Sequence, residues 1–209
     1  MRAIILLLVA AIVAPAQPWR QLFNGKDLTG WVMVGPGGFV VEDGALKTEG
    51  GMGLLYYQPE TLGNATVRVV FKTTATRSNS GVFIRLPEEP RDPWYGVHNG
   101  YEVQIEDSDD AWHSTGSLYS LSKATGRNQK PAGEWNTMDI VLDGQKTTVF
   151  LNGLQVNEFL GSQPAPLRQR WYEPVRGPRP DAGHIGLQNH DPRSTVYFRE
   201  ISVSRSRRR

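Results

Sequence analysis

The sequence of 209 residues contains no cysteine. This absence excludes a disulfide scaffold, a thiolate metal site and cysteine nucleophilic catalysis. The sequence also has no His-Glu-x-x-His, no phosphate-binding loop, no Gly-x-Ser-x-Gly and no calcium-loop pattern. Metalloprotease, nucleotide-binding and esterase functions therefore have no motif in their favour. The stretch Asp107-Ser-Asp-Asp110 offers oxygen ligands but lacks the glycine turn and distal Glu of a calcium loop, so we interpret it as an acidic surface loop.

No hydrophobic run is long enough to cross a bilayer. The longest covers residues 3–13, whereas a transmembrane helix needs about 20. Arg2 precedes this run, and Ala14-Pro15-Ala16 follows it in the small-x-small form of a cleavage site. The pattern predicts a secretory signal peptide over residues 1–16, and hence a secreted or periplasmic protein without stable membrane insertion. A buried N-terminal strand is the alternative interpretation.

The formal charge of +2 comes from the ends of the chain. Arg2 lies in the predicted leader, and four further arginines lie in a basic tail over residues 205–209. The remaining 18 Lys and Arg are outnumbered by 21 Asp and Glu, so the body is weakly acidic. Because this body has no basic stripe interleaved with aromatics, we expect no nucleic-acid partner. The pattern leaves the oligomeric state open.

The sequence has no long segment with helical periodicity. Short alternating runs are instead separated by turn signals at spacings of about 8–12 residues, as in an all-β sandwich or barrel. Asp143-Gly144 and Asn152-Gly153 are strong hairpin signals because both residues of each pair tolerate positive φ. A late strand that returns to the start of the meander favours a jelly-roll sandwich of two antiparallel sheets. The predicted strands are 66–72, 81–86, 101–105, 138–142, 147–151, 154–159, a short strand around Ile185 and Leu187, and 196–203.

The period-2 alternation of these strands sends several functional side chains away from the core. If Val82, Ile84 and Leu86 face the core, for example, Arg85 faces the other way. We predict that this second face is concave and holds a sugar, although a merely solvated sheet face is the alternative. The polar residues assigned to this face are Arg85, Glu102, Gln104, Glu106, His184, Gln188 and His190.

Two proline-rich stretches, residues 87–99 and 161–183, interrupt the regular spacing of strands. Loops of this length in a compact domain are usually functional or disordered. Their aromatic residues suggest the ordered rims of a binding site, although aromatics that only anchor the loops are equally compatible with the pattern. These residues are Trp94, Tyr95, Trp171 and Tyr172, which would also serve as stacking platforms in a non-catalytic carbohydrate-binding module.

The segment Glu102-Val-Gln-Ile-Glu106 is similar to the E-x-D-x-E signature of laminarinase-type glucanases. Those enzymes use two carboxylates of one strand as nucleophile and acid, about 5–5.5 Å apart. Residues four apart on a strand are separated by about 13 Å along the backbone, so the side chains would have to converge. Gln104 stands where the glucanases have an Asp, which leaves a conventional glucanase mechanism incomplete.

Short motifs in a fixed order resemble those of the 3-keto-disaccharide hydrolase domain family. They cover residues 20–204 almost completely, and each is weak alone while their order is fairly specific. The resemblance implies a concanavalin-like jelly roll over residues 17–204 that acts on glycosides oxidised to a ketone at carbon 3. The motifs are Phe23-Asn-Gly-Lys-Asp-Leu-Thr-Gly-Trp31, Ser78-Asn-Ser-Gly81, Tyr101-Glu-Val-Gln-Ile105 with Asp107, Thr115-Gly-Ser-Leu-Tyr119, Gly133-Glu-Trp-Asn136, Leu151-Asn-Gly153, Leu187-Gln-Asn-His-Asp191 and Val196-Tyr-Phe-Arg199.

Such a substrate permits proton abstraction at carbon 2, followed by elimination of the glycosidic oxygen from carbon 1. We expect Glu102 and His190 to act as base and acid, in an order that the sequence leaves open, with Asp107 as a third catalytic residue. No cofactor is implied, because the oxidation would take place on another enzyme. The expected substrate-binding residues are Arg85, Gln104, Gln188, His113, Tyr119 and Trp94.

Overall fold

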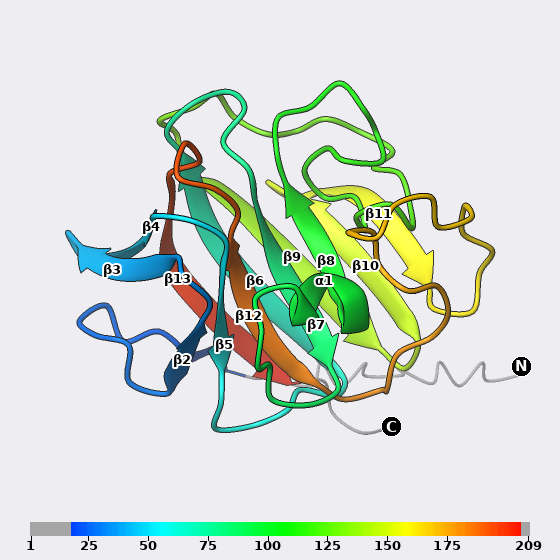
Figure 1. Ribbon diagram of the computed structural model, residues 1–209, viewed down its shortest axis with the longest axis horizontal. Helices are drawn as coiled ribbons and strands as arrows, with labels where there is room; N and C mark the ends of the chain where they lie inside the picture. Colours follow the sequence, from blue (N-terminus) through cyan, green and yellow to red (C-terminus); the bar gives the residue numbers. More distant parts are fainter. Residues whose placement is uncertain (1–17, 206–209) are drawn as a thin grey trace, which may run out of the picture.

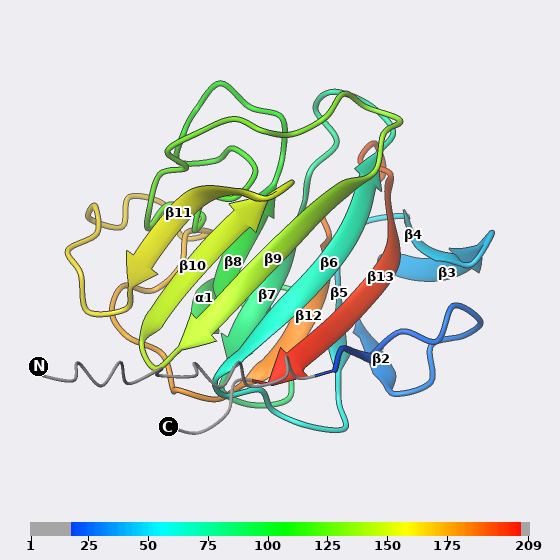
Figure 2. The same ribbon diagram turned by 180° about the vertical axis from the view of Figure 1, so that it is seen from behind.

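A computed structural model describes residues 18–205, which fold into two facing antiparallel sheets (Figures 1 and 2). Apart from one short helix, the regular structure within these residues is strand. The predicted all-β jelly-roll sandwich is therefore confirmed. The predicted signal peptide lies outside the described residues, as do residues 206–209 of the tail. No helix within the described range is long and apolar enough to span a membrane.

The larger sheet has eight strands in the order β11-β10-β9-β6-β13-β4-β3, with β1 paired to β13. It forms the rear layer in Figure 1 and the front layer in Figure 2. The late strand β13 pairs with β1, β4 and β6, which is the return to the start that the sequence predicts. Its strands are β1 (Arg20–Gln21), β3 (Gly38–Glu42), β4 (Ala45–Glu49), β6 (Ala65–Thr73), β9 (Asn136–Asp143), β10 (Lys146–Leu151), β11 (Leu154–Leu160) and β13 (Val196–Arg205).

The smaller sheet has five strands in the order β2-β5-β12-β7-β8. The short helix α1 (Tyr95–Asn99) packs on its outer face, in front of the sheet in Figure 1. All the predicted strands are present in the two sheets, while β1 to β5 are additional. The strands of the smaller sheet are β2 (Trp31–Val34), β5 (Gly53–Tyr57), β7 (Ser80–Leu86), β8 (Tyr101–Ile105) and β12 (His184–Asn189).

Hairpin turns set the register of the larger sheet. Asn152 and Gly153 connect β10 to β11 with φ values of 50° and 83°, as expected for a turn with two left-handed residues. Between β9 and β10 the loop residues are Gly144 and Gln145, and the positive φ falls on Gly144 alone. This second turn is therefore shifted by one residue from the predicted Asp143-Gly144 pair.

The hydrophobic core lies between the sheets and follows the predicted alternation. Val67, Val69 and Phe71 of β6 face Val82 and Ile84 of β7 in one buried cluster. A second, smaller cluster lies on the outer face of the five-stranded sheet, where α1 covers it. This cluster occupies only part of that face, which leaves the rest free to carry polar side chains.

Arg85 departs from the prediction because β7 contains a β-bulge. Residues 84 and 85 together oppose the single residue Ile185, and Arg85 has a φ of 56°. The extra residue shifts the alternation, so Leu86 packs in the outer cluster rather than in the core. The Arg85 guanidinium donates to the carbonyl of Gly144, in the turn between β9 and β10 of the larger sheet, and to those of Pro180 and Asp181 in the loop before β12. The prediction that Arg85 faces the sugar-binding side is wrong, because its side chain joins the two layers away from the pocket described below.

We predict that Arg85→Met lowers the free energy of unfolding by about 3 kcal/mol, since three carbonyls lose a charged donor in a buried setting. Arg127→Met is a matched control, because Arg127 pairs with Asp107 and Asp109 at an exposed position. Its loss should stay below about 1 kcal/mol. Chemical denaturation measures both. An Arg85→Met protein as stable as the Arg127→Met protein would contradict this role of Arg85.

Candidate active site

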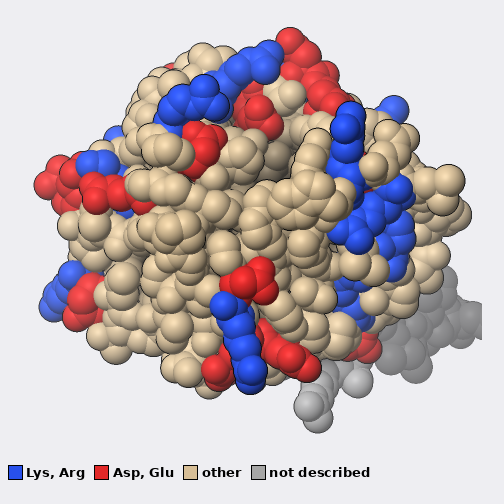
Figure 3. All heavy atoms as spheres, in the orientation of Figure 1, with Lys and Arg blue, Asp and Glu red and all other residues tan. Residues whose placement is uncertain are grey.

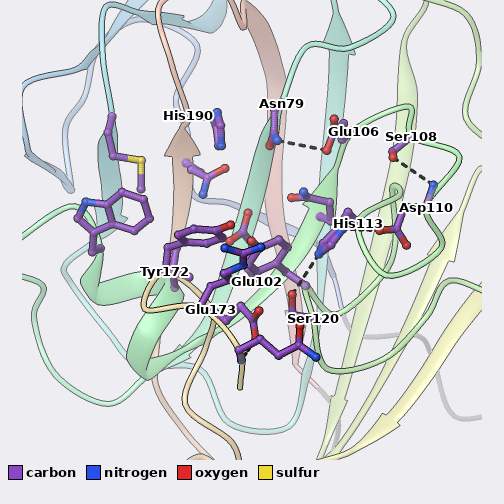
Figure 4. A pocket seen from close by; sticks show the side chains of 18 residues that line it. Asn79, Glu102, Glu106, Ser108, Asp110, His113, Ser120, Tyr172, Glu173 and His190 are labelled. Atoms are coloured by element: carbon purple, nitrogen blue, oxygen red, sulfur yellow. Dashed lines mark hydrogen bonds and ion pairs between the residues drawn. The ribbon is translucent and has the colours of Figure 1, made fainter. Parts of the chain in front are cut away.

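An open pocket of about 640 Å³ lies on the outer face of the five-stranded sheet, beside α1. Figure 3 shows the depression in this face, with Asp and Glu atoms around it in the upper half of the view. Its floor comes from β8 and β12, and its walls come from the loops over residues 106–122 and 161–183. The side chains that line it are drawn in Figure 4.

The alternation of β8 places Glu102 and Gln104 in this pocket. Tyr101, Val103 and Ile105 of the same strand are buried in the core, so the residues between them face outward. The neighbouring strand gives Glu102 its space, because a Cβ atom at Gly81 would lie 2.5 Å from Oε1 of Glu102. Gly81 therefore lets the carboxyl group lie flat against the sheet.

The Glu102 carboxyl is fully buried at the floor of the pocket. The pKa of this carboxyl is raised to about 8. Burial is the main cause, a hydrogen bond from Gln188 acts against it, and the charge of Glu106 adds to the rise. The side-chain nitrogen of Gln104 faces Glu102 and Ser80. It donates hydrogen bonds to Glu102 Oε1 at 2.9 Å and to the Ser80 carbonyl at 3.0 Å. Glu102 consequently holds its proton at neutral pH.

His190 forms an oriented pair with Asp191 on the opposite side of the pocket. Its Nδ1 lies 2.8 Å from Asp191 Oδ2, while the Arg193 N–H and the Ser194 hydroxyl donate to the same carboxylate at 2.7 and 3.1 Å. Burial acts to raise the pKa of Asp191, but these hydrogen bonds outweigh it and the pKa is lowered. With Nδ1 facing a charged carboxylate, the free Nε2 of the imidazole is the basic nitrogen.

Tyr119 and His113 form the wall next to Glu102. Their ring centroids are 5.0 Å apart. Burial, together with the charge of Glu102, raises the pKa of Tyr119 to about 12. The phenol therefore remains a hydrogen-bond donor throughout the physiological pH range.

Glu106 stands where the main pocket meets a second cavity of about 450 Å³. Asn79, Glu106 and His190 line both spaces, and Asn79 donates to Glu106 Oε2 at 3.2 Å. Burial raises the pKa of Glu106, whereas His190 and His113 act against this rise. The two cavities form one continuous groove with His190 and Glu106 at its middle.

The aromatic rim is built by the two long loops. Trp94, which precedes α1, packs against Trp171 with ring centroids 4.8 Å apart and the ring planes tilted by 58°. Tyr172 follows in the same loop and lines the pocket. Trp171 itself remains 64% exposed, while Tyr95 packs against the outer apolar cluster instead of the pocket.

The structure brings together seven of the nine residues that the sequence nominates. Arg85 is one exception, for the reason given above. Asp107 is the other: it lines a neighbouring cavity and pairs with Arg127 at 2.5 Å. Asp107 is an even number of residues from the buried residues of β8, so its side chain points away from the face that carries Glu102. The predicted placement of Asp107 in the catalytic pocket is therefore wrong. The seven residues in the pocket are Trp94, Glu102, Gln104, His113, Tyr119, Gln188 and His190.

Several pocket residues were not nominated. Asn79 belongs to a quoted family motif, Glu106 is among the polar residues that the alternation assigns to this face, and Tyr172 is one of the predicted rim aromatics, so all three have a signal in the sequence. Val97 lies in α1. The others lie on loops, where no periodicity indicates which way a side chain points. These are Met52, Ser108, Asp110, Ser120, Gln169, Arg170 and Glu173. No group of three or more His, Asp or Glu within the described residues is arranged to hold a metal ion.

The sandwich and its polar pocket define a carbohydrate-processing domain. The chain belongs to the family of 3-keto-alpha-glucoside-1,2-lyase-like domains, whose model matches residues 18–204. The resemblance noted in the sequence is therefore confirmed. None of the curated proteins compared with the chain is significantly similar to it in sequence.

Solved structures with the same fold support this assignment. Two come from Parabacteroides distasonis proteins provisionally assigned as glycosyl hydrolases. One is 24% identical (TM-score 0.73, 90% of this chain and 94% of that chain), and the other is 26% identical (TM-score 0.71, 90% and 100%). A Bacillus subtilis protein of unknown function with a galectin-like fold is 16% identical, with a TM-score of 0.64 over 94% of this chain and 98% of that chain.

The buried proton of Glu102 predicts a pH dependence of stability. The folded protein keeps this proton up to about pH 8, whereas the unfolded chain releases it near pH 4.5. Because the folded state binds more protons in this window, its free energy of unfolding falls as the pH rises, by up to about 1.4 kcal/mol per pH unit.

Denaturant titrations between pH 5 and pH 8 measure this slope, and Glu102→Gln should remove it. Replacement of the exposed Glu134 by Gln is the matched control and should leave the slope as in the wild type. A Glu102→Gln protein with the wild-type slope would contradict the assignment of the proton to Glu102.

Proposed function

We propose that the protein cleaves glycosides whose sugar carries a ketone at carbon 3, by proton abstraction at carbon 2 and elimination from carbon 1. The observation that carries this proposal is a proton-holding carboxyl, Glu102, in the same pocket as an oriented imidazole, His190. The family membership supports the substrate class. The sequence left the roles of the two residues open, and their environments now favour one assignment.

His190 is the proposed base. The ketone acidifies the hydrogen on carbon 2, so an imidazole nitrogen can abstract it. Asp191 holds Nδ1 and stabilises the imidazolium that forms, which leaves Nε2 to take the proton. The electron pair of the broken C–H bond passes into the enolate of the ketone.

Glu102 is the proposed acid. As the bond between carbon 1 and the glycosidic oxygen breaks, Glu102 gives its proton to that oxygen, and the leaving sugar departs as an alcohol. Water can then add to the double bond between carbons 1 and 2, with its proton going to Glu102 and the proton on His190 returning to carbon 2. With this step the net reaction is hydrolysis, and without it the enzyme is a lyase.

Amide and phenol groups around Glu102 supply the remaining interactions. Tyr119 is a donor that can face the enolate oxygen, whereas both N–H groups of Gln104 are already bonded to Glu102 and the Ser80 carbonyl. Oε1 of Gln188 is buried and lacks a partner within the described protein, so a sugar hydroxyl would satisfy it. The adjoining cavity of about 450 Å³ offers room for a second sugar beyond His190. These features suit a disaccharide that lies across the groove.

A carbohydrate-binding module without catalysis is the second candidate. The aromatic rim of Trp94, Trp171 and Tyr172 favours it, since exposed rings commonly stack on sugar faces. Saturable binding without turnover would support this alternative. Export by the N-terminal leader belongs to the proposal in either case.

Substrate discrimination tests the proposed reaction. Purified protein should cleave a 3-keto-disaccharide and leave the unoxidised parent intact, because only the ketone acidifies the hydrogen on carbon 2. Chromatography of the released sugars provides the measurement. Equal cleavage of both substrates would favour a conventional glucanase, and cleavage of neither with tight binding would favour the binding module.

Replacement of the acid tests the assignment of roles. Glu102→Gln should lower kcat by about 10²–10⁴-fold, because an amide cannot protonate the leaving oxygen. Wild-type kcat should fall above about pH 8, where Glu102 loses its proton. Glu106→Gln should cost less than about tenfold and move this decline to lower pH, since the charge of Glu106 helps Glu102 to keep its proton. A larger loss in Glu106→Gln than in Glu102→Gln would contradict the assignment.

A further inference from the structure

A second arrangement of reactive side chains lies on the wall of the pocket away from His190. Nδ1 of His113 is 2.7 Å from Asp110 Oδ2, and Nε2 of the same ring is 3.1 Å from the hydroxyl of Ser120. Figure 4 shows this hydroxyl, the imidazole and the carboxylate following one another along the wall. A carboxylate, an imidazole and a hydroxyl linked in this order form the arrangement that activates a serine as a nucleophile.

The local backbone holds each member of this triad in place. The Trp112 N–H donates to Asp110 Oδ1 at 3.0 Å, and the Asp110 N–H donates to the hydroxyl of Ser108 at 3.2 Å. Ser120 has a φ of 55°, a left-handed conformation that non-glycine residues rarely adopt. Its side chain reaches the pocket, although the residue as a whole is only 8% exposed. A strained serine on a fixed turn is a feature of sites where the hydroxyl must be presented to a substrate.

Two cavities of different character meet at Ser120 and His113. The main pocket is lined by Glu102, Gln104 and other polar groups. On the other side, a groove of about 180 Å³ shares Ser120 and His113 but includes Trp112, Pro166 and Leu167. A substrate held here would place a polar part in the main pocket, an apolar part in the small groove, and the bond between them at the serine.

We propose that Asp110, His113 and Ser120 form an esterase centre that removes a short acyl group from a sugar hydroxyl. This activity goes beyond the cleavage of keto-glycosides and needs neither Glu102 nor His190. Ser120 attacks the ester carbonyl while His113 takes the proton of the hydroxyl. His113 then protonates the departing sugar oxygen, and the acyl group remains on Ser120. Water, activated by His113, releases the acyl group as a carboxylic acid and restores the serine.

Side chains rather than backbone amides would stabilise the oxyanion. The N–H groups of Ser120 and Leu121 already donate to the carbonyls of Trp112 and Leu118, at 3.3 and 2.8 Å. Tyr119 precedes Ser120 in the chain and lines the same pocket, and its hydroxyl keeps its proton at neutral pH. A tyrosine hydroxyl can provide this stabilisation.

This centre has no known motif, since the chain contains no Gly-x-Ser-x-Gly. That motif belongs to one fold, in which it forms a turn between a strand and a helix. A serine triad is defined by its geometry, and its residues follow different orders in unrelated folds. Here the order is Asp, His and Ser within eleven residues of one loop.

Ester hydrolysis by the full chain tests the proposal. We expect release of 4-nitrophenol from 4-nitrophenyl acetate and butyrate, and of acetate from mono-O-acetylglucose. Ser120→Ala and His113→Ala should each lower kcat/KM by at least about 10³-fold. Ser122→Ala is the matched control, because this nearby serine bonds to Asn157 and not to an imidazole. It should keep the wild-type rate.

A fluorophosphonate probe on the wild-type protein provides a measurement that does not depend on how the variants fold. Peptide mass spectrometry should find the adduct on Ser120 and not on Ser122. Three results would each overturn the proposal: hydrolysis of none of the three esters, labelling at another residue, or an unchanged rate in a folded Ser120→Ala protein. Ester hydrolysis and keto-glycoside cleavage are measured with separate substrates on the same wild-type sample, so failure of the esterase and failure of keto-glycoside cleavage are distinguishable.

Discussion

The desolvation of one carboxyl group underlies the chemistry of this protein. Glu102 lies flat against a sheet between two amides, in a space that exists because β7 has a glycine, Gly81, beside the carboxyl group. A carboxylate would be costly there, so the group is held as an acid near neutral pH. The proposed general acid thus owes its proton mainly to burial, with a smaller contribution from the charge of Glu106.

The two sheets of the sandwich contribute to this environment in different ways. The larger sheet closes the core, and the smaller one carries polar side chains on its outer face next to the patch covered by α1. Arg85 fixes the layers to one another from the bulge in β7. The residues that stabilise the fold and those that line the pocket are therefore largely distinct, which allows the pocket to contain an unfavourable buried acid.

The alternation of side chains along each strand explains which pocket residues could be predicted from the sequence alone. Counting by two along β8 and β12 correctly placed Glu102, Gln104 and Gln188 together, although they come from strands about 80 residues apart. The same counting failed at Arg85, where a bulge inserts one residue, and bulges leave little trace in a sequence. The loop residues Ser120 and Glu173 have no such signal, because long-range packing rather than local periodicity directs their side chains.

The central claim is that Glu102 keeps its proton in the folded protein at neutral pH. Infrared titration of the carboxyl band, as a difference between the wild-type protein and Glu102→Gln, tests it most directly. We expect a protonated-carboxyl signal specific to Glu102 that persists at pH 7 and disappears around pH 8. Loss of this signal near pH 4.5, the ordinary value for a glutamate, would contradict the account.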